Sequence, residues 1–336
     1  MRNQMYHLIA ERKMSSNLIF NKDNNGAGEL SRLLGMIDIK STFSKWEPWL
    51  KHTTRQITSV IGKDVFKKVV ELYKKEDATD LDKELVEKVQ SSNALFAWLK
   101  IIPTLDAQHG NSGRQKRIAE NERGLTAEEQ FKDENNILTL AYESLDSLLD
   151  FLNDNIEEFA FWKDSEVYKS MKGLLISDLQ TFNQYYTIDS FRLFIAILPW
   201  IKETQDVDII PVLTLRGLQQ FKEAMGKKEE DQTDRDKKLV ALKDIIYRPL
   251  VLFSMVRAFK RLPVQAIPEG LVQVQIVGTV KERIKATESA IKQQILNLSD
   301  DAQGALDNLM NELTQLNEQG DPYISQVRMI GKGLIF

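Results

Sequence analysis

Apolar residues recur at intervals of seven in the middle of the chain, and this regularity constrains the fold more than any other feature. The series is Phe131, Leu138, Leu145, Leu152 and Phe159, with Tyr142, Leu149 and Ile156 between its members. Such a narrow apolar stripe is typical of a helix that packs along another helix. Thr126 and Glu129 precede it with the spacing of a capping box, a motif that starts helices. The pattern predicts a long helix that begins near residue 126.

Helical spacing also occurs on both sides of this segment. One face is formed by Trp46, Trp49, Leu50, Thr53, Ile57, Val60 and Ile61. Ser44 and Glu47 have capping-box spacing at its start, and Gly62 suits a left-handed stop at its end. A similar series, with a break near "LSDDAQGA", comprises Val280, Ile284, Ile291, Ile295, Leu298, Ala305, Leu309 and Leu313. The chain is therefore expected to be mainly α, with helical bundle-like units and small β-hairpin or strand elements.

Two segments of the chain resemble each other. "IDIKSTFSKWEPWLK" (residues 37–51) and "IDSFRLFIAILPWIK" (residues 188–202) align without gaps and share six identities in fifteen positions. Each is followed by a mixed-charge segment, an apolar helix, a glycine-bearing turn and a long helix. This common order predicts a tandem duplication. The alternative is that two helical hairpins of similar pattern occur by coincidence.

The expected organisation has four parts. Residues 1–36 form an N-terminal extension with a short helix, and residues 37–187 form the first repeat. Residues 188–320 form the second repeat, and residues 321–336 form a strand-like C-terminal tail.

Composition excludes several classes of function. The 336 residues include no cysteine, which excludes disulfides, thiol nucleophiles and cysteine-ligated metals. The net charge of −4 provides no overall attraction to nucleic acid, so DNA binding would need a local patch. The longest apolar runs, such as "LFIAILPWI", are about half of the ~20 residues that a membrane helix requires. The N-terminus lacks the apolar region of a secretory signal.

The stretch "QHGNSGRQKR" (residues 108–117) combines two glycines with the cations Arg114, Lys116 and Arg117. A phosphate-binding P-loop requires G-x-x-x-x-G-K-[ST], and this pattern is absent. A basic patch for nucleic acid is an alternative, although neighbouring glutamates dilute its charge. The corresponding stretch of the second repeat, "PEGLVQVQIVG", has no cation, which favours a turn followed by a strand. The three cations remain candidate contacts for DNA or for a protein partner.

No residue set has the spacing of a catalytic or cofactor site. His7, His52 and His109 lack partners at motif spacing and are best interpreted as solvated side chains. The stretch "NKDNNGAGE" lacks the closing glutamate of a calcium loop, because that position is Leu34. The five tryptophans lie among helix-periodic apolar residues, which favours core packing over base stacking. The sequence predicts no enzyme, no cofactor and no metal site.

The C-terminal segment "YISQVRMIGKGLIF" (residues 323–336) is apolar and rich in strand formers. It is too short to build a sheet of its own. It either pairs with a strand of the same chain or docks on a neighbouring protein by strand addition. Its candidate partner-binding residues are Ile330, Leu334, Ile335 and Phe336.

Three stretches carry a resemblance to a known group of proteins: "WEPWLKHTTRQITSVIGKDVFKKVVELY", "DAQHGNSGRQ" and "LTAEEQFKDENNILTLAYESLDSLLDFL". They resemble an uncharacterised family from phages and prophages of gut Bacteroidetes, which is similar to the head–tail connector (adaptor) proteins of tailed phages. In connectors an apolar helix ends at isoleucine–glycine before a short second helix, and Ile61–Gly62 matches this pattern. A small residue and a glycine then lead to a strand and a long helix, as do Ser112–Gly113. The duplication departs from single-unit connectors.

The resemblance implies a non-enzymatic virion structural protein that is assembled in the cytoplasm of the bacterial host. It would form a homo-oligomeric ring between portal and tail. Its partners would be portal and tail or neck proteins, with contact to DNA in the channel and no membrane. Two alternatives remain open. One is another phage or cytoplasmic scaffold or adaptor, and the other is a DNA-contacting packaging accessory protein that uses the cations near Arg114.

Overall fold

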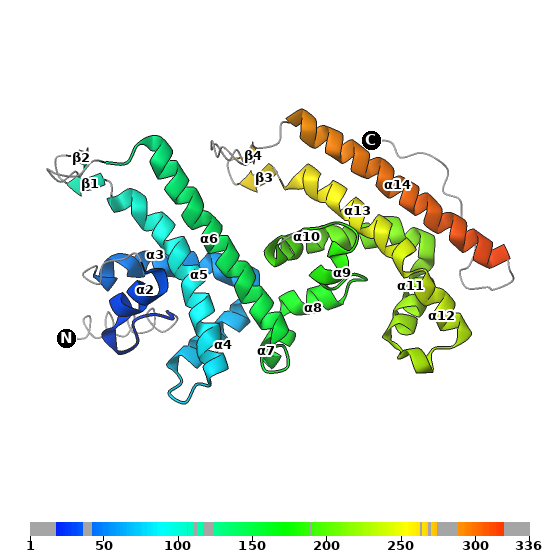
Figure 1. Cartoon of the computed structure of the whole chain (residues 1–336), viewed down its shortest axis with the longest axis horizontal. Helices are drawn as coiled ribbons and strands as arrows, with labels where there is room; N and C mark the ends of the chain where they lie inside the picture. The colour runs from blue at the N-terminus through cyan, green and yellow to red at the C-terminus, as the bar shows by residue number, and fades with distance from the viewer. Residues whose placement is uncertain are drawn as a thin grey trace. The chain divides into compact units, whose positions relative to one another are not determined.

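The computed structural model describes residues 18–35, 42–105, 107–110, 113–116, 124–188, 190–262, 264–267, 270–273 and 288–318. The protein is mainly α-helical, as the periodicity predicts (Figure 1). It divides into two compact units, and the division in the sequence lies between Lys169 and Ser170. Ser190–Arg192 group with the first unit.

The first unit is built around one central helix. Its elements are η1 (Lys22–Asn24), α2 (Gly26–Leu34), α3 (Phe43–Ile61), α4 (Lys63–Lys74), α5 (Asp80–Leu105), β1 (Ala107–Gly110), β2 (Gly113–Lys116), α6 (Ala127–Asp154) and α7 (Ala160–Lys163). Helix α8 (Glu166–Lys172) spans the division between the units. Residues 92–97 of α5 are all buried. Six consecutive buried residues cover the whole circumference of a helix, so α5 has neighbours on every side.

Helices α3 and α6 pack on different sides of α5. On one side the Thr53 hydroxyl donates to Asn93 Oδ1 at 2.6 Å. On the other side the hydroxyls of Ser92 and Ser144 are 2.9 Å apart. In Figure 1, α6 runs alongside α5, whereas α3 crosses it. The two helices therefore contact different parts of the α5 surface.

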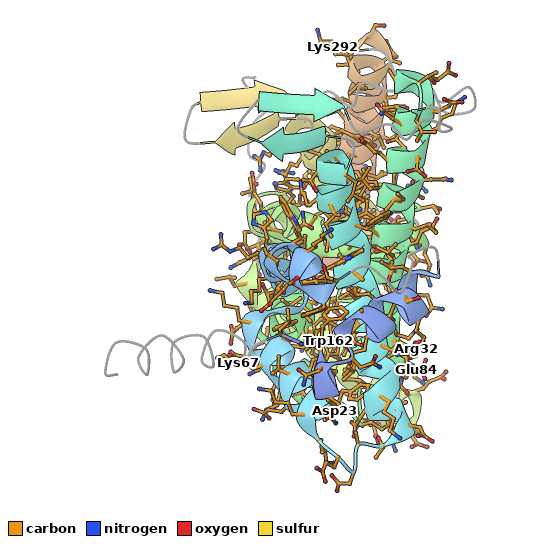
Figure 2. The ribbon with its side chains drawn as sticks, turned by 90° about the vertical axis from the view of Figure 1, so that its left-hand side faces the viewer. Asp23, Arg32, Lys67, Glu84, Trp162 and Lys292 are labelled. Atoms are coloured by element: carbon orange, nitrogen blue, oxygen red, sulfur yellow. The ribbon has the colours of Figure 1, made fainter. Side chains whose placement is uncertain are left out.

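Aromatic side chains fill the first unit. Trp46 is buried and stacks on Trp98, with ring centroids 5.3 Å apart. Trp162 is also buried, and its Nε1 donates to Asn153 Oδ1 at 3.0 Å. Core packing was expected for all five tryptophans, and it is confirmed for Trp46 and Trp162, whereas Trp49, Trp98 and Trp200 are half-buried. Figure 2, which views the molecule from the left-hand side of Figure 1, labels Trp162 together with the exposed Lys67.

The start of α3 differs from the prediction. The predicted buried face is confirmed, because Trp46, Leu50, Thr53, Ile57 and Ile61 are all buried. The capping box of Ser44 and Glu47 is wrong. The helix begins at Phe43, two residues earlier, with Thr42 at the N-cap position, and Glu47 instead accepts a hydrogen bond from Lys51 at 2.7 Å.

A single glycine connects α3 to α4. Gly62 has a φ of 90°, a backbone conformation that residues with a Cβ rarely adopt. The predicted stop at Gly62 is therefore confirmed, and α4 begins directly after it.

The buried stripe of α6 follows the natural period of the helix. The capping box of Thr126 and Glu129 is confirmed, with both reciprocal bonds present. Phe131 and Leu138 are only half-buried, however, and the helix ends at Asp154, before Phe159. The buried residues are Ile137, Ala141, Leu145, Leu148, Leu149 and Leu152. A straight helix repeats every 3.6 residues, so its core face drifts away from a strict seven-residue series.

The second unit has a similar succession of elements. After α9 (Leu179–Asn183) it contains α10 (Phe191–Thr204), η2 (Gln205–Ile209), α11 (Ile210–Gly226), η3 (Glu229–Asp231), α12 (Asp234–Ala241), α13 (Lys243–Arg261), β3 (Val264–Ile267), β4 (Gly270–Gln273) and α14 (Glu288–Glu318). Helix α13 packs along α14.

The predicted break in the last helix is wrong. Helix α14 runs without interruption through "LSDDAQGA". The two aspartates of this stretch, Asp300 and Asp301, are exposed. The buried residues of the helix include Leu298, Ala302, Leu309 and Leu313. The polar residues therefore lie on the solvent side of a continuous helix, where they do not interrupt the apolar stripe.

Two short antiparallel hairpins each precede a long helix. In the first, β1 pairs with β2 and Gly110 lies opposite Gly113. In the second, β3 pairs with β4 and Ile267 lies opposite Gly270. Each hairpin follows closely on the end of an apolar helix, α5 or α13.

Equivalent threonines cap helices in both units. The amide of Asp82 donates to Thr79 Oγ1 at 3.1 Å before α5, and the amide of Asp236 donates to Thr233 Oγ1 at 3.2 Å before α12. We expect Thr79→Ala and Thr233→Ala each to lower the free energy of unfolding by about 0.5–2 kcal/mol, because each leaves a helix amide without its acceptor. Urea denaturation followed by circular dichroism measures the effect, with Thr→Ser at each position as the control. Unchanged midpoints in both alanine variants would contradict the assignment.

Low pH is expected to lower the stability of the second unit because Asp236 becomes protonated. The hydrogen bonds from Lys227 Nζ, at 2.8 Å, and from Thr233 lower the pKa of Asp236 from 3.8 to about 2. The folded state thus favours the charged carboxylate, so its stabilising contribution is complete above about pH 4 and is lost as the pH falls towards 2. Unfolding measured between those pH values should show a smaller acid dependence in Asp236→Asn. An identical dependence in both proteins would rule out this role.

Candidate interaction surface

The predicted site residues lie partly within the described chain. Arg114 and Lys116 are on β2, where their backbones pair with His109 and Ala107 of β1. Only the backbone is described there. Arg117 and the C-terminal set lie outside the described residues; that set is Ile330, Leu334, Ile335 and Phe336. His52 is exposed on α3, as expected for a solvated side chain.

Exposed apolar side chains are found at the junction of α10 and α11. Val207 in η2 is 58% exposed, and Leu215 in α11 is 71% exposed. Pro211, between them, is also exposed. We call these three residues the η2 apolar set. Exposed apolar residues of this size in a short segment are typical of a surface that contacts another protein.

A π-helical turn displays Val207. The amide of Ile210 donates to the carbonyl of Gln205, five residues earlier, in place of the usual four. Pro211 follows and has no amide, so the regular hydrogen-bond ladder cannot continue through it. The Gln205 side chain is buried, and its Oε1 accepts from the amide of Leu175 at 2.9 Å. The sequence thus disrupts the helix here and holds the disrupted turn in place. π-turns of this kind are frequent at functional sites.

A second irregularity follows at Thr214. Its φ of 62° and ψ of 159° interrupt the helix, and β-branched residues rarely adopt such a positive φ. Its hydroxyl accepts from the amide of Gly217 at 3.2 Å. Thr214 therefore acts as an internal N-cap that restarts the helix, and Leu215 is the first residue of the new turn.

Arg257 of α13 supports this junction through three contacts. Its Nη2 lies 2.8 Å from Asp208 Oδ2, and its Nε lies 3.4 Å from Glu203 Oε1. Its Nη1 donates to Thr204 Oγ1 at 3.0 Å. Arg261 forms a two-pronged pair with the same Glu203. The guanidinium groups thus fix the end of α10 and the π-turn onto α13.

The two carboxylates differ in environment. Burial raises the pKa of Asp208, and the nearby Arg257 opposes this shift. The hydrogen bond from Arg261 lowers the pKa of Glu203. The Asp208 carboxyl group is therefore largely shielded from water, and its charged form depends on Arg257 for compensation. This arrangement suits a rigid support and offers no acid–base pair facing an open cavity.

Sequence reasoning did not identify this surface. The segment "TQDVDIIPVLTL" has helical spacing with a proline inside its apolar part. Only that proline inside an apolar run signalled an irregular turn. The exposure of Val207 and Leu215 depends on the turn geometry, which residue spacing does not encode.

Among the residues that the structure describes, no cluster of three or more histidine, aspartate or glutamate side chains could hold a metal ion. Within the same part of the chain, no helix is long and apolar enough to cross a membrane.

Comparison with known proteins gives one match. Residues 57–172, about a third of the chain, match the model of a family of unknown function (DUF6712). The matched range begins within α3 and ends at the last residue of α8. No curated protein and no solved structure matches the chain. Over this range the protein is similar to a family whose members have no assigned activity.

Proposed function

We propose that the protein is a non-enzymatic structural protein of a bacteriophage virion, a head–tail connector that forms part of a ring between portal and tail. The observation that carries this proposal is the similar order of elements in the two units. In both units a capped helical segment leads to an apolar helix, a short hairpin and a long helix. A protein made of repeated helical units suits an assembly in which many similar contacts are formed around a ring.

The sequence at the capped helices supports a tandem duplication. "TDLDKELV" begins at Thr79 and "TDRDKKLV" begins at Thr233, and six of their eight residues are identical. Both threonines make the same capping interactions with an aspartate three residues later. Agreement in sequence, capping geometry and element order argues against two unrelated hairpins. We therefore retain the two repeats, at residues 37–187 and 188–320, as part of the proposal.

The resemblance to connectors gains support from two local features. Helix α3 ends at Ile61, and Gly62 leads directly to the short helix α4. Gly113 begins β2, which precedes the long helix α6. These features occur in the order that connectors use.

A doubled unit has a consequence for symmetry. Six copies would present twelve similar modules, so one ring could join a portal and a tail of different symmetry. The η2 apolar set and the C-terminal residues Ile330, Leu334, Ile335 and Phe336 are the surfaces that we assign to virion partners. The cations at Arg114, Lys116 and Arg117 are assigned to contacts with a partner or with DNA in the channel.

The test is to purify particles of the phage that encodes the chain and to identify the proteins that remain on them. We expect the chain to be present, and cryo-electron microscopy to place it between portal and tail. Native mass spectrometry of the purified protein, alone and with portal, should show ring-sized oligomers. A chain that is absent from particles and stays monomeric with portal would refute the proposal.

A further inference from the structure

Charge is segregated within the first unit. Residues 43–75, which span α3 and α4, include eight Lys or Arg and three Asp or Glu. Helix α6 has the opposite balance, with one Lys and eight Asp or Glu. Because α3 and α6 pack on different sides of α5, the basic and acidic helices present their outer surfaces in different directions. The first unit is therefore electrostatically polar.

The outer surface of α3 is basic. Its exposed residues include Lys45, Pro48, His52 and Arg55, which we call the α3 face. Within the described part of the chain, Lys45 and Arg55 form no ion pair, and α3 has no exposed acidic residue. Glu47, the acidic residue of this helix, is half-buried and pairs with Lys51 at 2.7 Å. Among the described residues, these two positive charges on either side of Pro48 therefore have no acidic side chain paired with them.

The outer surface of α6 is acidic. Its exposed residues include Asp133, Leu140, Glu143, Asp150 and Asp154, which we call the α6 face. Asp150 already experiences unfavourable surroundings, because burial and then repulsion from Asp146 and Asp154 raise its pKa. Like charges four residues apart destabilise a helix.

The two faces have matching spacing. Along α3 the order is Lys45, then Pro48 three residues later, then Arg55 after a further seven. Read backwards along α6, the order is Glu143, then Leu140 three residues earlier, then Asp133 after a further seven. At 1.5 Å per residue both sets cover about 15 Å of helix, and each spans about 80° of the circumference. An antiparallel pairing would set cation against anion at both ends and Leu140 against Pro48 in the middle.

We propose that copies of this chain associate through these faces, with the α3 face of one copy against the α6 face of the next. Because the two faces are different surfaces of one unit, the contact is heterologous and repeats from copy to copy, which closes into a ring where the rotation permits. This inference rests on the proposed ring and specifies which surfaces form its subunit contact. Leu140, 46% exposed, supplies an apolar centre, and the charges form the rim.

Charge reversal on the full-length protein tests the pairing. Lys45→Glu/Arg55→Glu makes both faces acidic, and Asp133→Lys/Glu143→Lys makes both faces basic. We expect each double variant alone to self-associate at least about tenfold more weakly than the natural chain, because like charges would meet. Mixing the two variants in equal amounts should restore oligomers of alternating composition. Sedimentation velocity and native mass spectrometry at low and high salt would measure the change.

A matched control separates face-specific effects from net charge. Lys237→Glu/Lys260→Glu changes the net charge by the same amount as Lys45→Glu/Arg55→Glu, on exposed residues of the second unit. This control should retain the oligomers, and circular dichroism should show that all variants are folded.

The outcomes distinguish this inference from the proposed function. If the natural chain forms rings that both reversals leave intact, the pairing is wrong and the connector proposal stands. If Lys45→Glu/Arg55→Glu weakens DNA binding in a gel shift and both reversals leave self-association unchanged, the α3 face is a nucleic-acid surface and the pairing is also wrong. A natural chain that stays monomeric at high concentration refutes the pairing, whereas its presence on particles tests the connector role separately.

Discussion

Replacing Arg257 with alanine is expected to lower the free energy of unfolding of the second unit by about 3–5 kcal/mol. The side chains of Arg257 and Asp208 are only 16% and 18% exposed, so their pair is largely withdrawn from water. Removing the guanidinium leaves the Asp208 carboxylate buried without its cation and also removes the donor to Thr204. Chemical denaturation followed by circular dichroism would measure the loss.

A paired substitution identifies the cause. Arg257→Met/Asp208→Leu removes both charges and retains apolar volume, so it should cost clearly less than Arg257→Ala alone. If the single and double variants are equally destabilised, loss of the contacts from Arg257 to Thr204 and Glu203, and not an uncompensated Asp208 charge, explains the effect. The π-turn should also loosen in Arg257→Ala, which faster amide hydrogen exchange in η2 would report.

Replacing Trp162 with alanine is expected to destabilise the first unit by about 3–5 kcal/mol. The side chain is completely buried, and truncation would leave a cavity beside α6 together with an unpaired Asn153. Trp162→Phe keeps most of the apolar contact and loses the indole hydrogen bond, so it should cost about 1–2 kcal/mol. Thermal and urea unfolding of both variants measures the difference. Equal stability of the alanine and phenylalanine variants would contradict the packing role.

The sequence allowed some elements to be predicted because their signals are local. The capping box of Thr126 and Glu129, the stop at Gly62 and the buried face of α3 each depend on residues within a few positions of one another. Local geometry determines these features, so spacing alone is sufficient. The mainly α character follows from the same periodicity.

Other features were not predictable from spacing alone. Glu47 has the spacing of a cap but also lies four residues before Lys51, and it is the lysine that pairs with its carboxylate. Contacts between distant residues determine two further features. Helix α14 continues through Asp300 and Asp301 because its buried stripe on α13 is uninterrupted. The π-turn depends on Arg257, which is some fifty residues from Asp208 in the chain. Periodicity cannot report a partner of that kind.

The buried residues of α5 and the outer residues of α3 and α6 differ in how much they matter for stability. Residues 92–97 of α5 are buried around the whole circumference of the helix. Almost any substitution there would therefore lower the stability of the fold. The outer residues of α3 and α6 are exposed, and most substitutions on exposed helix surfaces change stability little. Related chains can therefore exchange one set of outer charges for another, and so acquire new partners, while the inner helix stays the same. Evolutionary divergence in binding and conservation of architecture can proceed side by side within a single unit.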